Sequence, residues 1–113
     1  MITIKPLNNS NYNNGFTVEG HAELASHGFD ILCSAVSGSL TVLERQLSYA
    51  MDEEYFGLLI TTKEGYKRIE IHSTQAPSDW AGVAEAMIQG WYDVMEQLAK
   101  QYPDNLKVEE WIL

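Results

Sequence analysis

The sequence predicts an α+β fold, in which a small antiparallel or mixed sheet carries two packed helices. The expected order is strand, strand, helix, strand, strand, helix and a possible last strand. Two observations lead to this fold class: two pairs of short alternating segments, and two long segments with apolar residues at helical steps. Hairpins that alternate with helices build such layers. With 113 residues available, we expect residues 1–113 to form a single domain with a modest core.

The first pair of strands is predicted at residues 1–7 and 16–20. Ile2 and Ile4 share one face of the first segment, and Phe16 and Val18 share one face of the second. Between these segments, residues 8–15 contain five asparagines and a glycine, which are typical of a turn or loop. We therefore expect an antiparallel hairpin.

The first helix is predicted from residue 30 to about residue 49, after a loop at residues 22–29. Asp30 is a favourable N-cap, because its carboxylate can accept hydrogen bonds from the amide groups of the first turn. Apolar residues at three- and four-residue steps predict a buried stripe at Leu32, Val36, Leu40, Leu43 and Leu47.

The second pair of strands is predicted at residues 58–62 and 66–72, joined by a glycine-containing turn at residues 63–65. The second helix begins at Ser78 or Asp79 and ends at about residue 102, before Pro103. Its expected apolar stripe is Trp80, Ala84, Met87, Trp91, Met95, Leu98 and Tyr102. Residues 106–113 alternate enough for a short last strand, in which Trp111 would cover an edge.

The formal net charge of −9 argues against nucleic acid as a direct partner, because phosphate backbones require patches of lysine and arginine. This charge suits a basic protein segment, although it also serves solubility alone. No apolar run approaches the roughly 20 residues of a membrane span. The first residues show no secretory signal, and a single cysteine suits a reducing compartment. We therefore expect no membrane partner and a cytoplasmic location.

The residues that carry chemistry gather in residues 20–37, which hold two of the three histidines and the only cysteine. If Asp30 caps the helix, Cys33 falls at the third helical position, where the helix dipole favours a thiolate. A loop of twelve residues can bring His21 beside the sulfur. These are the parts of a cysteine nucleophile and its base. The spacing equally allows a small buried cysteine and a structural histidine.

Several neighbouring residues allow further interpretations. Ser37 lies one helical turn after Cys33, so it can hydrogen-bond near the pair or simply let the helix pack closely. His72, at the end of a predicted strand, is a rival base. Zinc bound by His21, His27 and Cys33 would lack a fourth ligand and the usual spacing, and a redox sensor would require a second cysteine. We therefore expect no metal and no cofactor.

Two linked motifs in this stretch resemble the signature of the ribosomal-processing cysteine protease family, called Prp. The family reads Gly-His-Ala, a short loop with a glycine, and then Asp-Ile-Val-Cys-Ala-Ala-Val-Ser. Leu32 and Ser34 replace the usual valine and alanine. The matching residues are Gly20, His21, Ala22, Gly28, Asp30, Ile31, Cys33, Ala35, Val36 and Ser37.

The resemblance implies a small α+β fold, a homodimer and a cysteine endopeptidase with a Cys–His dyad. Cys33 would be the nucleophile and His21 its base, while Asp30 would either cap the helix or orient His21. Backbone amides at the helix start, including that of Cys33, would stabilise the oxyanion. The implied substrate is a ribosomal large-subunit protein that loses a short N-terminal extension or, as for related phage proteins, a capsid or scaffold protein.

The competing function class is a non-catalytic homodimeric peptide-binding module whose cysteine is inert and buried. Such a module would not need both His21 and Cys33, so this pair discriminates between the two classes. Exposed sheet edges and aromatic helix stripes make a dimer plausible in either class.

Overall fold

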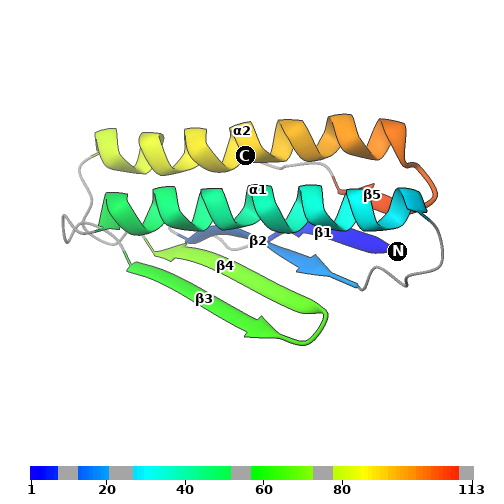
Figure 1. Ribbon diagram of the computed structural model, residues 1–113. Coiled ribbons are helices and arrows are strands. Elements are labelled where there is room, and N and C mark those ends of the chain that lie inside the picture. The colour runs from blue at the N-terminus through cyan, green and yellow to red at the C-terminus, as the bar shows by residue number, and fades with distance from the viewer. Residues whose placement is uncertain (8–12, 21–26, 52–56, 73–77, 110–113) are drawn as a thin grey trace.

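The predicted α+β order is present in the protein. The computed structural model describes residues 1–7, 13–20, 27–51, 57–72 and 78–109. Its elements, shown in Figure 1, are β1 (Ile2–Pro6), β2 (Asn13–Glu19), α1 (His27–Met51), β3 (Gly57–Lys63), β4 (Tyr66–His72), α2 (Ser78–Gln101) and β5 (Leu106–Val108).

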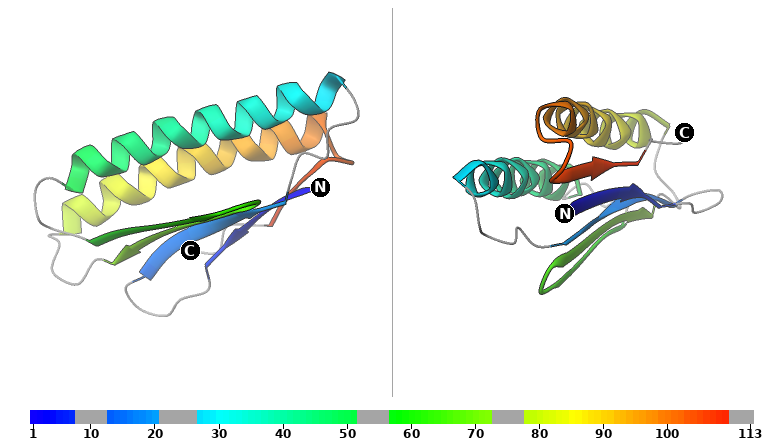
Figure 2. Two further views of the ribbon diagram at one scale, coloured as in Figure 1. Left: turned by 60° about the horizontal axis from the view of Figure 1, so that its bottom comes forward. Right: turned by 90° about the vertical axis from the view of Figure 1, so that its right-hand side faces the viewer.

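The five strands form one mixed sheet in the order β3-β4-β2-β1-β5. Neighbouring strands are antiparallel except for β1 and β5, which run parallel. Both helices lie side by side on the same face of this sheet, as the two views in Figure 2 show. The result is a two-layer arrangement with its core between the helices and the sheet.

The core combines alternate residues of the central strands with the apolar stripe of α1. Ile4, Phe16 and Ile69 contribute fully buried side chains from three adjacent strands. The predicted α1 stripe is confirmed, because each of its five residues is at most 5% exposed. Burying an aliphatic side chain of this kind contributes about 1.5–3 kcal/mol, so the stripe fixes how α1 sits on the sheet.

The buried face of α2 is wider than predicted. Ile88 and Tyr92 are fully buried, although neither belongs to the expected stripe. The reason is that α2 packs against both α1 and the sheet, so two flanks of the helix are covered. The Trp91 ring stacks on Phe16 with centroids 4.7 Å apart, and its indole Nε1 donates to Ser39 Oγ of α1 at 3.0 Å.

Two elements begin earlier than predicted. β2 begins at Asn13 because its first residues pair with β4, which extends the strand into the asparagine-rich segment. α1 begins at His27, so the expected helix start at Asp30 is wrong. An acidic residue stabilises the N-terminal end of a helix both at the cap position and within the first turn. Asp30 therefore indicates that a helix begins nearby, but it does not specify the first helical residue. Helical Gly28 costs only about 1 kcal/mol, which the packing of α1 outweighs.

The last strand is shorter than predicted and pairs in parallel with β1. Leu106 lies opposite Ile2, and Val108 lies opposite Ile4. The expected strand residues beyond 109, including Trp111, lie outside the described part of the chain. Within the described part, no helix combines the length and apolar character that a membrane crossing requires.

Tyr92 should make stability depend on alkaline pH. Its hydroxyl donates to the carbonyl of Glu109 at 2.9 Å, and burial, with the charges of Glu109 and Glu96, raises the pKa of the Tyr92 phenol. Above the ordinary tyrosine pKa of about 10, the unfolded phenol ionises while the folded one keeps its proton, so this group lowers stability by about 1.4 kcal/mol per pH unit.

This effect can be isolated by comparing urea unfolding of the wild type and Tyr92→Phe between about pH 9 and pH 11. The variant should lose about 1 kcal/mol at neutral pH with the hydrogen bond, yet fall less steeply at high pH. Parallel stability curves for the two proteins would contradict this role of Tyr92.

Candidate functional site

Cys33 lies on α1, six residues after the first helical residue His27. Its side chain is half-buried and packs against the core on the helix face that carries Leu32 and Val36. The expectation that Cys33 occupies the third helical position is therefore wrong. Two consequences follow for its chemistry.

The first consequence concerns the helix dipole, whose effect falls off beyond the first turn and is weaker at Cys33 than predicted. The second concerns the oxyanion. In an α-helix the N–H of each residue beyond the first four is engaged with a carbonyl four residues earlier. The amide of Cys33 is thus committed to the helix and is not available as an oxyanion donor, contrary to the expectation.

His21 lies outside the described residues, whereas the residue before it, Gly20, is described. Gly20 has φ of 106°, a backbone conformation that residues other than glycine rarely adopt. Its N–H donates to the carbonyl of Gly65 at 2.9 Å. A Cβ at this position would overlap the carbonyl oxygen of Met1. The end of β2 is therefore held between β1 and the β3–β4 turn, and only glycine fits there.

His72 ends β4 at the opposite end of the sheet from Gly20. Glu19, next to Gly20, pairs with Tyr66, whereas His72 pairs with Asn13. Six strand residues of about 3.3 Å each separate these two ends by about 20 Å. The rival base is thus far from the end of β2 where the chain leads into His21.

Asp30 and Ser37 lie one turn before and one turn after Cys33 on α1, so the three residues share one side of the helix. Ser37 is exposed, and its carbonyl accepts a hydrogen bond from Thr41 Oγ1 at 2.9 Å. The side chain of Asp30 is not among those the structure describes.

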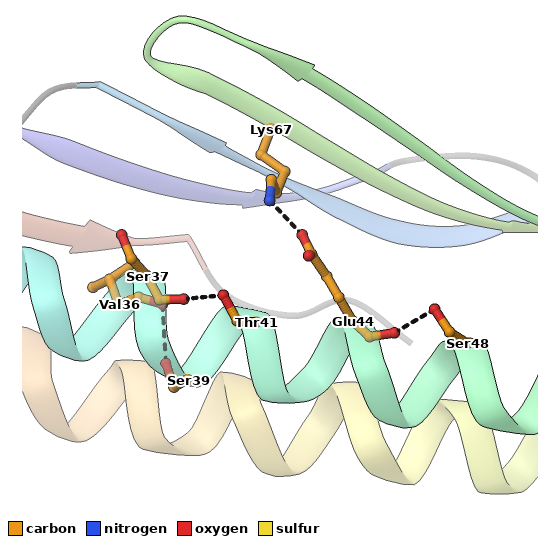
Figure 3. Close-up of polar contacts among 7 residues, drawn as sticks. All are labelled: Val36, Ser37, Ser39, Thr41, Glu44, Ser48 and Lys67. Atoms are coloured by element: carbon orange, nitrogen blue, oxygen red, sulfur yellow. Dashed lines mark hydrogen bonds and ion pairs between the residues drawn. The ribbon is translucent and has the colours of Figure 1, made fainter.

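The same side of α1 is tied to the sheet by an ion pair. Lys67 Nζ of β4 donates to Glu44 Oε1 of α1 at 2.5 Å, as Figure 3 shows. Both side chains are partly buried, with 26% and 19% exposed. This charge-assisted hydrogen bond joins α1 to β4, and removal of one partner would leave the other charge partly buried and unpaired.

Between α1 and the β3–β4 hairpin lies a cavity of about 230 Å³, the hairpin cavity. One wall comes from α1 and contains Ser37 and Thr41. The opposite wall combines Gly20 with residues of the hairpin, including Lys63 and Lys67. The hairpin cavity thus brings together the residue before His21 and the residue one turn beyond Cys33.

Among the described residues, no group of three His, Cys, Asp or Glu side chains is placed to hold a metal ion. His27 is the first residue of α1. The zinc site considered from the sequence would also require His21, which is not described.

The sequence interpretation missed Thr41, Glu44 and Lys67. Thr41 and Glu44 follow Cys33 at eight and eleven residues, which are helical steps on one side. Lys67 lies two residues before the buried Ile69 on β4, so the two side chains point to the same face of the sheet, toward the helices. Both patterns are present in the sequence and could have indicated the ion pair between Glu44 and Lys67.

The sequence model of the family described as cysteine protease Prp matches residues 1–107. No curated protein matches the sequence significantly. Solved structures share the fold. One is the essential ribosomal processing protease Prp from S. aureus in complex with a substrate peptide (18% identity, TM-score 0.66, covering 96% of this chain and 98% of that chain). The same protease with a covalently linked product peptide gives 20% identity and a TM-score of 0.64, with coverage of 96% and 98%. SMU.848 from Streptococcus mutans gives 20% identity and a TM-score of 0.61, and the match covers 96% of this chain and 92% of that chain.

Proposed function

Because this chain belongs to the cysteine protease Prp family, we propose that it is a cysteine endopeptidase with Cys33 as nucleophile and His21 as base. The observation that carries the proposal is the family match over residues 1–107, which spans both residues. The position of Gly20 supports it, because the fixed end of β2 leads directly into His21.

The reaction would proceed through a thioester. His21 takes the proton of the Cys33 thiol, and the thiolate attacks the scissile carbonyl. His21 then gives this proton to the leaving amine as the C–N bond breaks. Water, deprotonated by His21, hydrolyses the thioester and restores the thiol.

Asp30 and Ser37 are proposed supporting residues. Because α1 begins at His27, Asp30 is not its N-cap residue, and we propose that Asp30 orients His21. Its place one turn before Cys33 is compatible with this role, since residues three apart are neighbours on a helix. Ser37, one turn after Cys33, is exposed at the hairpin cavity and can contact a bound peptide.

The proposed substrate is a ribosomal large-subunit protein that loses a short N-terminal extension. The S. aureus relative is a ribosomal processing protease that binds a substrate peptide. Ribosomal proteins are basic, and the net charge of −9 on this chain would speed their encounter. Such a substrate would place the protein in the cytoplasm. A phage capsid or scaffold protein is the alternative substrate.

The direct test is incubation of the protein with the ribosomal precursor, followed by intact-mass measurement of both proteins. One cut near the precursor N-terminus is the expected result. A phage capsid or scaffold precursor, tested in parallel, decides between the two substrate classes.

The second candidate function is a homodimeric peptide-binding module without catalysis. The half-buried position of Cys33 against the core favours it, because structural cysteines are commonly packed in this way. Binding of the precursor with no change in mass over long incubation would move this function to first place.

We also propose that the protein is a homodimer. Trp91, one of the aromatic residues that suggested a dimer, is only 6% exposed and is not available for a dimer contact. An aliphatic surface takes its place. A groove of about 670 Å³ runs between the outer faces of α1 and α2, and its walls include Val42, Val83 and Val94, which are 41–58% exposed. A second copy of the chain would cover these side chains.

Sedimentation equilibrium at micromolar concentration should give twice the monomer mass of 12.7 kDa. Val94→Glu should give the monomer, because a dimer would have to bury the new carboxylate. Leu59→Glu is the matched control, since Leu59 is 50% exposed on the edge strand β3, away from the groove. Dissociation by Leu59→Glu with no effect of Val94→Glu would assign the dimer to the sheet edge instead.

A further inference from the structure

The ion pair between Glu44 and Lys67 joins α1 to the paired strands β2 and β4 (Figure 3). On the sheet side, Lys67 lies opposite Val18 of β2, two residues before Gly20. The N–H of Gly20 donates to the carbonyl of Gly65, two residues before Lys67. Lys67 therefore belongs to the same hydrogen-bonded unit as the end of β2.

On the helix side, Glu44 and Cys33 point in nearly the same direction from α1. Glu44 follows Cys33 by eleven residues, which at about 100° per residue is about 20° more than three full turns. The two residues are about 16 Å apart along the helix axis. Ser37, one turn after Cys33, lines the hairpin cavity together with Gly20, so this side of α1 faces the end of β2.

The ion pair supplies a directional contact that the apolar stripe of α1 does not. Burial of the leucine side chains holds the helix on the sheet, but the hydrophobic effect is non-directional. The hydrogen bond between Lys67 Nζ and Glu44 Oε1, at 2.5 Å, weakens when α1 turns about its axis or slides along it. Apolar residues in place of a buried ion pair are often as stable, so stability alone does not account for this pair.

We propose that Glu44 and Lys67 are positioning residues, whose ion pair fixes the rotation and axial position of α1 and so directs the Cys33 thiol toward the end of β2 that leads into His21. This inference rests on the proposed peptidase function. At a radius of about 5–6 Å, each 10° of helix rotation moves a side chain by about 1 Å. A displacement of this size in a catalytic group can cost about 100-fold in rate.

The test uses variants that separate position from stability. The double variant Glu44→Met/Lys67→Met removes both charges and keeps two unbranched stems, so its melting temperature should stay close to that of the wild type. Its kcat for precursor cleavage should nevertheless fall about tenfold or more with KM nearly unchanged, whereas a purely stabilising pair would leave kcat at the wild-type value. Glu44→Gln, which keeps the shape of the side chain, should change kcat in the same direction.

Alkylation of Cys33 by iodoacetamide gives a second readout, which requires no substrate. The double methionine variant should raise the pH of half-maximal alkylation toward the ordinary thiol value of about 8.5, because His21 would share the thiol proton less. In a His21→Ala background, the same two substitutions should produce no further shift. A direct effect of the Glu44 charge on the thiol would persist in that background, although over about 16 Å it is largely screened.

The reversed pair, Glu44→Lys/Lys67→Glu, keeps opposite charges on the two elements and should recover most of kcat and of the alkylation midpoint. Tyr92→Phe is the control for a loss of stability alone, because it removes a hydrogen bond of α2 and leaves the ion pair in place. It should keep the wild-type alkylation midpoint.

A folded double methionine variant with wild-type kcat and an unchanged alkylation midpoint would overturn the positioning role. A loss that the reversed pair does not recover would assign the effect to the substituted side chains and would also reject it. The proposed function fails separately, because the wild type itself would then leave the precursor uncut.

Discussion

Replacing Cys33 by alanine should lower precursor cleavage by several orders of magnitude, and His21→Ala should do the same. A nucleophile and its base act as a unit, so the double variant should be about as poor as either single one. Cys33→Ser should also fail, because a serine hydroxyl stays protonated where a thiol can ionise. Initial cleavage rates of the precursor, followed by intact mass, give these comparisons.

Alkylation by iodoacetamide reports on the same pair without any substrate. If His21 shares the thiol proton, the pH of half-maximal alkylation should lie below the value of about 8.5 for an ordinary thiol. His21→Ala should shift it upward. This comparison matters because α1 begins at His27, which leaves the helix dipole too distant to activate Cys33 alone.

The controls are His27→Ala and His72→Ala, which should cleave at nearly the wild-type rate. His72 ends β4 at the far end of the sheet, and His27 begins α1. Two outcomes would reject the dyad: cleavage by Cys33→Ala at the wild-type rate, or loss of cleavage in a folded His72→Ala protein.

The element order and the core of α1 could be predicted because their signals are local and repeated. Leu32, Leu40 and Leu47 are set by helical spacing over many residues, and no other period fits them. The burial of Ile88 and Tyr92 could not be predicted in this way, because it depends on α2 packing against two neighbours at once. A single stripe describes only one of these contacts.

The start of β2 was predicted less well, because it is decided by long-range pairing. Asn13 and Asn14 have turn-forming side chains, yet both belong to β2 because β4 supplies partners for them. The same limit applies to the candidate site. Cys33 and Ser37 could be placed on one helix, but the hairpin opposite them could not be located from the sequence.

Gly20→Ala should lower stability by at least about 2 kcal/mol and cleavage by about 100-fold. An alanine at φ of 106° is strained, and its Cβ would also overlap the carbonyl oxygen of Met1. Moving the end of β2 away from Met1 would relieve this overlap. His21 follows directly, and a displacement of about 1 Å in a catalytic group can cost about 100-fold in rate.

Gly38→Ala is the control that separates this effect from loss of a glycine in general. Gly38 is exposed within α1, and a Cβ there meets no atom within 4 Å. Alanine in a helix interior is favoured over glycine by about 0.5–1 kcal/mol, so this variant should be more stable than the wild type and cleave normally. Urea unfolding and precursor cleavage measured on both variants give the comparison. A Gly20→Ala protein with wild-type stability and rate would show that the end of β2 yields without moving His21, and would remove the physical reason for glycine at this position.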